Sequence, residues 1–247
     1  MSVIRFENVV KRFGGETVLD GVSFEVRKGE VFAVVGPSGT GKSVLLKHIV
    51  RLLTPTSGAV YFDDVDVSAC EGRELERIRG RIGYLFQSGA LMAWLTVAEN
   101  VALPLREKTD LPESEISRRV DDALAAVELA GAADKYPSEI SGGMQKRAGL
   151  ARAIVRESDI VLYDEPTSGL DPVTSVTINQ LIRKLAVERG ITSVVVTHDL
   201  QGALKIADRI LLLKRGKVAE CSAPAEFVNS GNRDVREFLA AMKGEVL

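Results

Sequence analysis

An apolar run that ends at a glycine-rich loop constrains the fold of this chain more than any other feature. The run is Val31 to Val35, and the loop after it, Gly36-Pro37-Ser38-Gly39-Thr40-Gly41-Lys42-Ser43, satisfies the pattern G-x-x-x-x-G-K-[ST]. Its glycines let the backbone fold tightly around phosphate oxygens, while loop amides and the next helix direct partial positive charge at them. Lys42 would reach the β- and γ-phosphates of a nucleotide, and the Ser43 hydroxyl would hold Mg²⁺. We therefore predict a buried strand, a phosphate-binding loop and a helix from Lys42 to about Leu53.

The rest of the chain alternates short apolar runs with longer helical patterns. This alternation predicts an α/β fold with a mainly parallel sheet and flanking helices. Further core strands are expected at Ile82 to Phe86, Ile160 to Tyr163, Thr192 to Val196 and Ile210 to Leu213. Helices between them are expected at Val173 to Glu188 and Leu200 to Ala207.

Two regions depart from this alternation. The stretch up to Val26, joined later by Ala59 to Val67, has strand-like patterns without an intervening helix, which predicts a small N-terminal antiparallel sheet beside the nucleotide. Leu95 to about Glu157 is mostly helical and predicts an inserted helical subdomain. We expect one domain of 247 residues, whose parts are a β subdomain with the core (1–87 and 158–223), a helical subdomain (88–157) and a helical tail (224–247).

Composition narrows the class of protein. Hydrophobic residues make up 45% and charged residues 27% of the chain, which is typical of a globular domain. The net charge is −2, and acidic and basic residues are interspersed, so we expect no nucleic-acid partner. The two cysteines, Cys70 and Cys221, fit no metal-ligand spacing and are expected to be free thiols in a reducing cytoplasm. No stretch approaches the ~20 apolar residues of a membrane span, so a link to a membrane would require a partner.

Two adjacent carboxylates follow the apolar run Ile160 to Tyr163. Asp164 can bind Mg²⁺, and Glu165 can polarise an attacking water as general base. The alternative is an ordinary acidic turn after a core strand. His198 follows another apolar strand, at the edge of the sheet where ligands bind in open α/β folds, so it could sense the γ-phosphate rather than serve a structural role. His48 has no such placement and is expected to pack or lie on the surface.

A second anion-binding element lies at Ser141-Gly142-Gly143, before a helix predicted from about Met144 to Val155. One nucleotide has one γ-phosphate, so a second cradle in the same chain needs an explanation. No N-K-x-D guanine-recognition motif is present in the sequence, which disfavours a GTPase.

Taken together, these motifs resemble the nucleotide-binding subunits of ABC transporters over essentially the whole chain. The Walker A motif falls on Gly36 to Ser43, the Q-loop on Gln87, the signature motif on Ser141 to Gly143, Walker B on Ile160 to Asp164, the D-loop on Ser168 to Asp171, and the switch histidine on His198. The resemblance implies the fold of a P-loop NTPase with an ABC-ATPase core, and it implies ATP and Mg²⁺ as cofactors. It assigns Glu165, His198 and Lys42 to catalysis, Ser43, Gln87 and Asp164 to Mg²⁺, and Phe13 to stacking on adenine, with ordinary packing as the alternative for Phe13. Asp171 is assigned to ATP binding.

The resemblance also explains the second cradle. In the family two subunits pair head to tail, and Ser141 to Gly143 of one copy would close over ATP held by the phosphate loop of the other. Gln87 would couple closure and reopening to a membrane partner, as a two-state switch set by the γ-phosphate.

Finer features are similar to the ATPase subunits of lipid transporters associated with MCE proteins, the Mla type. They are Ser88-Gly89-Ala90-Leu91 after Gln87, the run Leu95 to Val101, Pro104 to Glu107, and Met144 after the signature glycines. The similarity implies ATP-driven transport of phospholipid between the inner membrane and the outer envelope. It implies a permease of the MlaE type, an MCE-domain protein and a small STAS-type regulatory subunit as partners. The chain would then lie at the cytoplasmic face of the inner membrane.

One segment departs from that pattern, and other functions stay open. Met92-Ala93-Trp94 replaces a more usual Phe-Asp-Ser-like stretch near the permease contact, and Trp94 is either a partner anchor or a packed aromatic of the helical subdomain. An importer ATPase for a small polar solute such as an amino acid would have the same catalytic residues. A non-transport ABC protein is disfavoured, because the chain has one cassette and no long coiled-coil insertion.

Overall fold

The computed structural model describes residues 2–243, and a six-stranded sheet lies at its centre in the order β10-β9-β3-β8-β7-β6. Neighbouring strands from β9 to β6 run parallel, and β10 is antiparallel to β9. The strands are β3 (Val31–Val35), β6 (Ile82–Leu85), β7 (Ile160–Asp164), β8 (Thr192–Thr197), β9 (Arg209–Lys214) and β10 (Lys217–Ser222). Every residue of β3, β7 and β8 is buried, which explains why these strands read as unbroken apolar runs. The predicted mainly parallel α/β core is confirmed, and β10 is a strand that the patterns did not predict.

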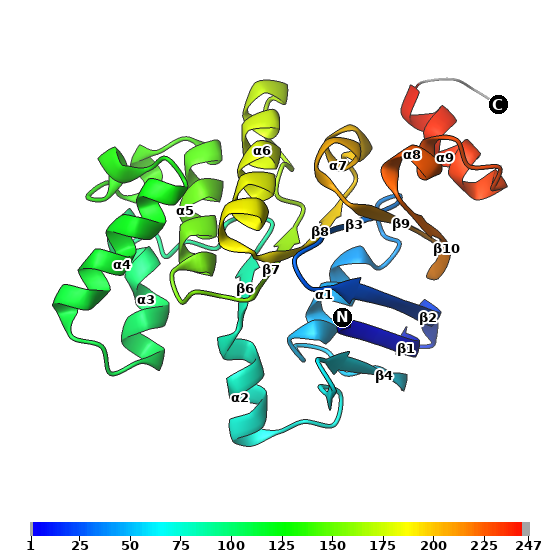
Figure 1. Cartoon of the computed structure of the whole chain (residues 1–247), viewed down its shortest axis with the longest axis horizontal. Coiled ribbons are helices and arrows are strands. Elements are labelled where there is room, and N and C mark those ends of the chain that lie inside the picture. The colour runs from blue at the N-terminus through cyan, green and yellow to red at the C-terminus, as the bar shows by residue number, and fades with distance from the viewer. Residues whose placement is uncertain (1, 244–247) are drawn as a thin grey trace.

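A second, antiparallel sheet packs beside α1, in the order β2-β1-β4-β5. Its strands are β1 (Ser2–Phe13), β2 (Glu16–Arg27), β4 (Ser57–Phe62) and β5 (Val65–Asp66). One apolar core joins this sheet, α1 and the near face of the central sheet, with Phe6, Phe32 and Phe62 fully buried in it. The predicted N-terminal antiparallel sheet is therefore confirmed (Figure 1).

The helices around the core agree with the sequence patterns except in two places. They are α1 (Lys42–Ile49), α2 (Gly72–Gly80), α6 (Pro172–Arg189), α7 (Leu200–Ile206), α8 (Pro224–Val228) and α9 (Arg233–Lys243). Helix α1 ends at Ile49 and not near Leu53, because the backbone turns left-handed at Arg51, with φ +50°. Helix α2 was not predicted. The expected tail helices are present up to Lys243, and the last four residues of the tail lie outside the described residues.

The helical region lies on the left of the molecule in Figure 1. It contains α3 (Val97–Lys108), α4 (Glu113–Ala126), α5 (Gly142–Ile154) and two short 3-10 turns, Ala130–Ala132 and Pro137–Glu139. Thr96 and Glu99 form a reciprocal capping box that starts α3. Asn100 is fully buried, and its amide donates to the carbonyls of Met92, Leu95 and Thr96. This network fixes the turn that carries Trp94.

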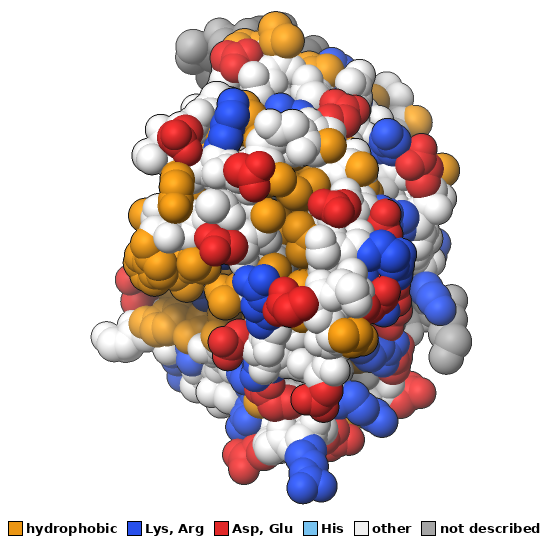
Figure 2. Space-filling view, turned by 90° about the vertical axis from the view of Figure 1, so that its left-hand side faces the viewer, with side chains coloured by type: hydrophobic (Ala, Val, Ile, Leu, Met, Phe, Trp, Pro, Cys, Tyr) orange, Lys and Arg blue, Asp and Glu red, His pale blue; other side chains and the backbone are white. Residues whose placement is uncertain are grey.

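Figure 2 faces the helical region and shows Lys and Arg side chains interspersed with Asp and Glu. On α4, for example, Arg118 pairs with both Glu115 and Asp122. Apolar side chains gather toward one edge of this face. Among residues 2–243, no helix is both long and apolar enough to cross a membrane.

Candidate functional site

The predicted site residues converge at the carboxyl ends of three adjacent parallel strands, β3, β8 and β7. The phosphate loop leaves β3 at Gly36, His198 follows β8, and Asp164 ends β7. Strand β8 lies between the other two, with Val35 opposite Thr197 and Asp164 opposite Val196. Parallel pairing alone therefore brings together side chains that are far apart in the sequence.

The loop after β3 has the backbone that a phosphate cradle needs. Gly36, Gly39 and Gly41 have φ of +154°, +80° and +94°, a region that side chains disfavour. A Cβ on Gly36 would lie 2.2 Å from the carbonyl oxygen of Leu213, so the chain passes close to β9 at this point. Helix α1 starts at Lys42 immediately after the left-handed Gly41, which points the amides at the N-terminus of α1 toward the loop.

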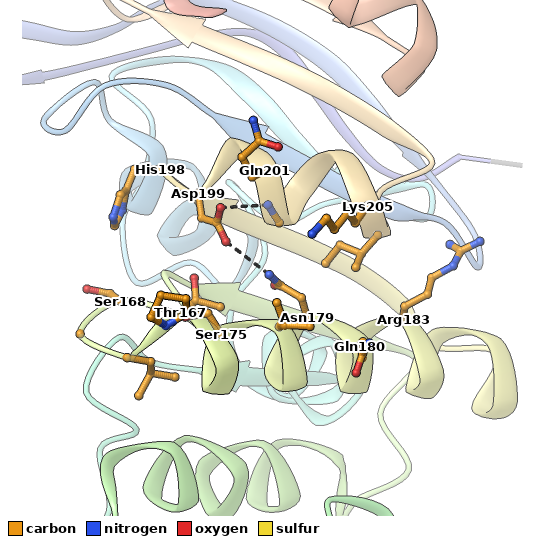
Figure 3. A pocket seen from close by; sticks show the side chains of 16 residues that line it. Thr167, Ser168, Ser175, Asn179, Gln180, Arg183, His198, Asp199, Gln201 and Lys205 are labelled. Carbon is orange, nitrogen blue, oxygen red and sulfur yellow. Dashed lines mark hydrogen bonds between the residues drawn. The ribbon is translucent and has the colours of Figure 1, made fainter. Parts of the chain in front are cut away.

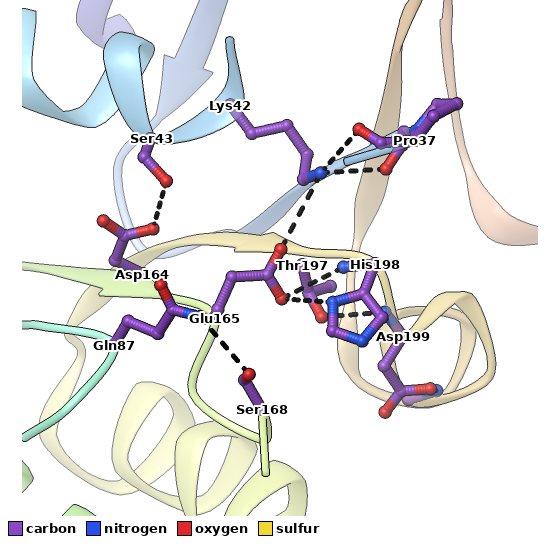
Figure 4. A network of polar contacts seen from close by, with 12 residues as sticks. Pro37, Lys42, Ser43, Gln87, Asp164, Glu165, Ser168, Thr197, His198 and Asp199 are labelled. Carbon is purple, nitrogen blue, oxygen red and sulfur yellow. Dashed lines mark hydrogen bonds and ion pairs between the residues drawn. The ribbon is translucent and has the colours of Figure 1, made fainter. Parts of the chain in front are cut away.

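Lys42 is buried within its own loop (Figure 4). Its Nζ donates to the carbonyls of Gly36 at 2.9 Å and Pro37 at 3.0 Å, and it lies 3.7 Å from Oε1 of Glu165. Burial lowers the pKa of Lys42, and the Glu165 carboxylate opposes that shift. The ammonium thus has two carbonyl acceptors and one carboxylate as internal partners, which anionic phosphate oxygens could replace.

Ser43 and Asp164 form a pair of oxygen donors suited to a hard cation. The Ser43 hydroxyl donates to Oδ1 of Asp164 at 2.6 Å, and the hydroxyl of Tyr84 donates to Oδ2 at 3.2 Å. Hydroxyl and carboxylate oxygens are the ligands that Mg²⁺ takes beside nucleotide phosphates. These two side chains therefore fit a Mg²⁺ ion that would neutralise phosphate charge when a nucleotide is bound.

Glu165 and His198 contact each other directly. Oε2 of Glu165 accepts from the backbone N–H of His198 at 3.2 Å and lies 2.7 Å from Nδ1 of the same residue (Figure 4). Glu165 has φ +49°, an uncommon conformation for a residue with a side chain. Strain of this kind persists where the surroundings hold it, and it often marks functional sites. The carboxylate is thus aimed into the space between the phosphate loop and His198.

Gln87 and Asp171 contact neighbouring segments. Nε2 of Gln87 donates to Oγ of Ser168 at 3.3 Å. Asp171 caps α6: one carboxylate oxygen accepts the backbone N–H of Val173 and of Thr174, each at 3.0 Å, and the other accepts the hydroxyl of Thr174. The bonds from Thr174 hold the pKa of Asp171 below its usual value. The Mg²⁺ role of Gln87 and the ATP-binding role of Asp171 remain predictions. In the structure, Asp171 is the N-cap of α6.

The signature element is not part of this cluster. Ser141 caps α5 by accepting the N–H of Met144 at 3.3 Å, and both Ser141 and Gly142 are exposed. Gly143 packs so closely on α6 that a Cβ there would lie 2.4 Å from Cγ2 of Thr174. Figure 1 shows α5 on one side of the central sheet and α1 on the other. Within one chain, the signature element and the phosphate loop therefore lie on opposite sides of the central sheet.

The two aromatic candidates are exposed. Phe13 ends β1, is 43% exposed, and has Nζ of Lys11 4.9 Å from its ring centroid. Trp94 is 73% exposed. The alternative that Trp94 packs inside the helical subdomain is therefore wrong for this chain, since its ring lies mostly in solvent.

Two residues near the carboxylates were missed in the sequence. Tyr84 reaches Asp164 from β6, and the buried Lys146 reaches the backbone of Glu165 from α5 at 3.3 Å. Predicting Tyr84 required the order of the strands. Lys146 could have been found from the sequence. A lysine on a helix face of small and apolar residues indicates a buried ammonium that needs hydrogen-bond partners.

A cavity of about 720 Å³ lies beside this cluster, between α6 and α7 (Figure 3). Ser168 and His198 stand at one end of it, and Arg183 and Lys205 line the other. Asp199 crosses between the two helices, accepting from the amide of Asn179 at 3.3 Å and the N–H of Gly202 at 2.9 Å. The cavity adjoins the end of the site at His198.

The chain is similar in sequence to ATP-binding proteins of transport systems. A family model described as ABC transporter matches residues 19–168. The chain is 41% identical over 244 residues to the intermembrane phospholipid transport system ATP-binding protein MlaF of Haemophilus influenzae, covering 99% of this chain and 91% of that protein. It is 40% identical over 247 residues to the methionine import ATP-binding protein MetN of Caulobacter vibrioides, covering 99% of this chain and 74% of that protein.

A solved structure has a similar fold. It is a dimeric post-hydrolysis state of an ATP-binding cassette bound to ADP and Pi, with a TM-score of 0.82 and 38% identity. The match covers 90% of this chain and 98% of that one.

Proposed function

The chain belongs to the ABC transporter family and is an ATPase, and from this premise we propose that its ATP hydrolysis drives movement of a phospholipid or similar hydrophobic molecule through a separate permease. The observation that supports ATP hydrolysis is the converging cluster at the ends of β3, β7 and β8. There Glu165 is held by His198 and faces Lys42 of the phosphate loop.

We assign the hydrolytic roles from this geometry. Glu165 accepts a proton from the attacking water, and His198 keeps its carboxylate oriented. Lys42 leaves its internal carbonyl partners for the β- and γ-phosphates, as the other loop residues Gly36 to Gly41 wrap them. Mg²⁺ held by Ser43 and Asp164 would offset the phosphate charge. Gln87 would complete the Mg²⁺ site, and Phe13, exposed at the edge of the antiparallel sheet, would stack on adenine.

A second copy of the chain completes the site in this proposal. Ser141 and Gly142 are exposed at the start of α5 and far from the phosphate loop of the same chain, which leaves them free to close over ATP held by a partner copy. The dimeric state of the related cassette supports this arrangement. Asp171 would then help ATP binding indirectly, by fixing the start of α6 against the signature element. We also propose that residues 88–157 act as a helical subdomain that shifts on closure.

The permease would bind a groove next to the helical region. The groove measures about 480 Å³ and is lined by Leu52, Tyr84 and Phe86 together with Arg79, Lys108 and Arg156. Leu52 and Phe86 are exposed, and Phe86 directly precedes Gln87, so a permease segment seated there would contact the loop that reaches Ser168. Such contacts would place the chain at the cytoplasmic face of the inner membrane.

The lipid assignment rests on the resemblance to a phospholipid-transport ATPase at 41% identity over nearly the whole chain. Under this assignment, the proposed partners are a permease of the MlaE type, an MCE-domain protein and a small STAS-type subunit. The second candidate, import of a small polar solute such as an amino acid, is supported by the 40% identity to a methionine importer subunit.

Purification of the native complex separates these two candidates. The complex would be isolated through a tag on this chain, and its proteins and lipids identified by mass spectrometry. An MCE-domain protein with bound phospholipid is the expected result. A periplasmic solute-binding protein in place of the MCE protein, with no enriched lipid, would overturn the lipid assignment and establish the importer.

A further inference from the structure

Lys146 is a buried cation that none of the roles above uses. It lies in the first turns of α5, and only 6% of its surface is exposed. An ammonium group is costly to bury unless its donors are satisfied. Burial lowers the pKa of Lys146, and the nearby carboxylates of Asp164 and Glu165 oppose that shift. A charge buried this deeply beside two carboxylates of the candidate site requires specific hydrogen-bond partners.

Its partners are two backbone carbonyls from separate segments. Nζ of Lys146 donates to the carbonyl of Gln87 and, at 3.3 Å, to the carbonyl of Glu165. Gln87 in turn donates through its side chain to Ser168, just beyond Glu165. The ammonium therefore ties the loop of Gln87 to the turn of Glu165, at the point where both contact α5.

The rest of α5 holds the same loop. Two turns further along, Arg152 donates to the carbonyls of Gly89 at 2.8 Å and Ala90 at 2.7 Å. Gly149 lies between the two cations, and a Cβ there would meet the Gly89 oxygen at 3.1 Å. The loop from 87 to 90 is thus bound to one face of α5, and any shift of α5 moves it. Within this network, Arg152 donates only to the loop, whereas Lys146 donates both to the loop and to the carbonyl of Glu165.

Glu165 needs such support because its backbone is left-handed, with φ +49°. Its N–H donates to Val196 at 2.9 Å, which holds the peptide before it, and its carbonyl accepts from Lys146, which holds the peptide after it. A backbone in this conformation is unfavourable for a residue with a side chain and persists only where its surroundings hold it. The direction of the Glu165 carboxylate therefore depends on both contacts.

We propose that Lys146 is a positioning residue for ATP hydrolysis, which holds the backbone of Glu165 so that its carboxylate faces the attacking water and links that backbone to the loop of Gln87. This inference rests on the proposed role of Glu165 as base. Lys146 approaches the site from the side of α5 and donates to backbone rather than to the phosphate loop, so it acts on turnover and not on nucleotide affinity.

Substitution of Lys146 by Met in the full-length chain tests this role. Methionine keeps the length and apolar stem but removes the donors. We expect kcat to fall at least about 10-fold, while the Kd for a fluorescent ATP analogue changes less than about twofold. Lys146→Arg, which restores a cation with several donors, should recover a large part of kcat. A wild-type kcat in the Met variant, or a loss of nucleotide affinity as large as the loss of turnover, would overturn the proposal.

Two further variants separate positioning from general packing. Lys146→Gln keeps a donor for Gln87 but is shorter by about one bond, roughly 1.5 Å, so it should not reach Glu165 and should lose kcat like the Met variant. It also replaces the Met variant if that protein does not fold, as judged by thermal unfolding. Arg152→Met removes only the hydrogen bonds to the loop at Gly89 and Ala90, so we expect kcat to fall less than in the Lys146 variants. Equal losses in the Arg152 and Lys146 variants at equal stability would show that loop anchoring alone matters.

Glu165→Gln, measured beside them, keeps the two hypotheses distinguishable. An active Glu165→Gln protein would overturn the assignment of the base, whatever the Lys146 variants do. An inactive Glu165→Gln protein beside a fully active Lys146→Met protein would leave the base assigned and overturn the positioning role.

Discussion

Lys42 and Glu165 satisfy each other in this structure, so nucleotide binding replaces existing contacts rather than filling unpaired groups. The lysine holds two carbonyls of its own loop and lies 3.7 Å from Glu165. In the proposed mechanism, bound phosphate would draw Lys42 away from Glu165, and Glu165 would keep its contact with His198 and face a water molecule. One carboxylate thus has two partners with different functions, the cation of the phosphate loop and the orienting histidine.

Replacing Glu165 by Gln should separate binding from hydrolysis. The amide has nearly the same shape but cannot accept a proton, so we expect turnover to fall by about 10²–10⁴-fold while ATP still binds. Gel filtration with ATP and Mg²⁺ should show a trapped closed dimer. Glu157→Gln is the matched control, because Glu157 also has a left-handed backbone, with φ +57°, but lies on the surface away from the site. Near wild-type hydrolysis by the Glu165 variant would contradict the assignment.

His48 should make stability depend on pH. It is 2% exposed in α1, and its Nδ1 donates to the carbonyl of Val44 at 2.6 Å. Burial lowers the pKa of His48 from its usual 6.5. The unfolded chain then binds the proton first as pH falls, so this residue lowers the free energy of unfolding below pH 6.5, by at most about 1.4 kcal/mol per pH unit.

Thermal unfolding of His48→Gln checks that expectation. The variant cannot titrate at this position, so its unfolding temperature should change less between pH 7 and pH 5 than that of the wild type. Parallel curves for the two proteins would show that His48 makes no such contribution.

Among the secondary-structure elements, α5 and β6 approach each other closely. A Cβ on Gly83 of β6 would lie 2.2 Å from the carbonyl oxygen of Ala153 in α5. Backbone therefore meets backbone there, and the glycine sets how near α5 comes to the central sheet. Because α5 carries Ser141 at one end and Lys146 within it, this contact also sets where those groups lie relative to Glu165.

Gly83→Ala should separate α5 from the sheet. Overpacking of a tight contact typically costs about 1–3 kcal/mol, which for a chain of this length lowers the unfolding temperature by about 3–10 °C. Gly131→Ala is the matched control, because a Cβ there meets nothing within 4 Å. Calorimetry should show a clear loss for the first variant and little change for the second. Equal unfolding temperatures for both would mean that α5 can shift at no cost.

For the molecule as a whole, the two elements that we propose bind phosphate lie apart, with the loop at the start of α1 and the signature element at the start of α5 (Figure 1). Within one chain, α5 packs on β6 and α6, on the other face of the central sheet from α1. We propose that pairing of two copies lets each half complete a site on the other, which would make hydrolysis a property of the dimer.

Activity should therefore depend on association. The rate of ATP hydrolysis should rise more than in proportion to protein concentration through the range where monomers pair. The measurement is a concentration series of steady-state hydrolysis, with the mass of the species followed by light scattering. Strictly linear activity from a proven monomer would refute the proposal.

The elements closest to the site could be predicted because their patterns are local. The buried run of β3, the glycines of the phosphate loop and the carboxylates after β7 each follow from a short stretch of sequence. The parallel core and the antiparallel sheet were predictable for the same reason. Helix α2 and strand β10 were missed because α2 has only two buried residues, and β10 is an edge strand whose burial alternates little.

The amino-acid sequence by itself determined which candidate groups this protein carries: a phosphate-loop motif, a pair of carboxylates, a histidine and a second glycine-rich helix start, each defined by local spacing. Only the tertiary structure decided which of these meet. Strand order placed Tyr84 on Asp164 and His198 on Glu165, and the packing of α5 placed Lys146 on the backbone of Glu165. Contacts of this kind depend on which distant segments become neighbours, and that is set by the burial of whole elements rather than by any pattern within one of them.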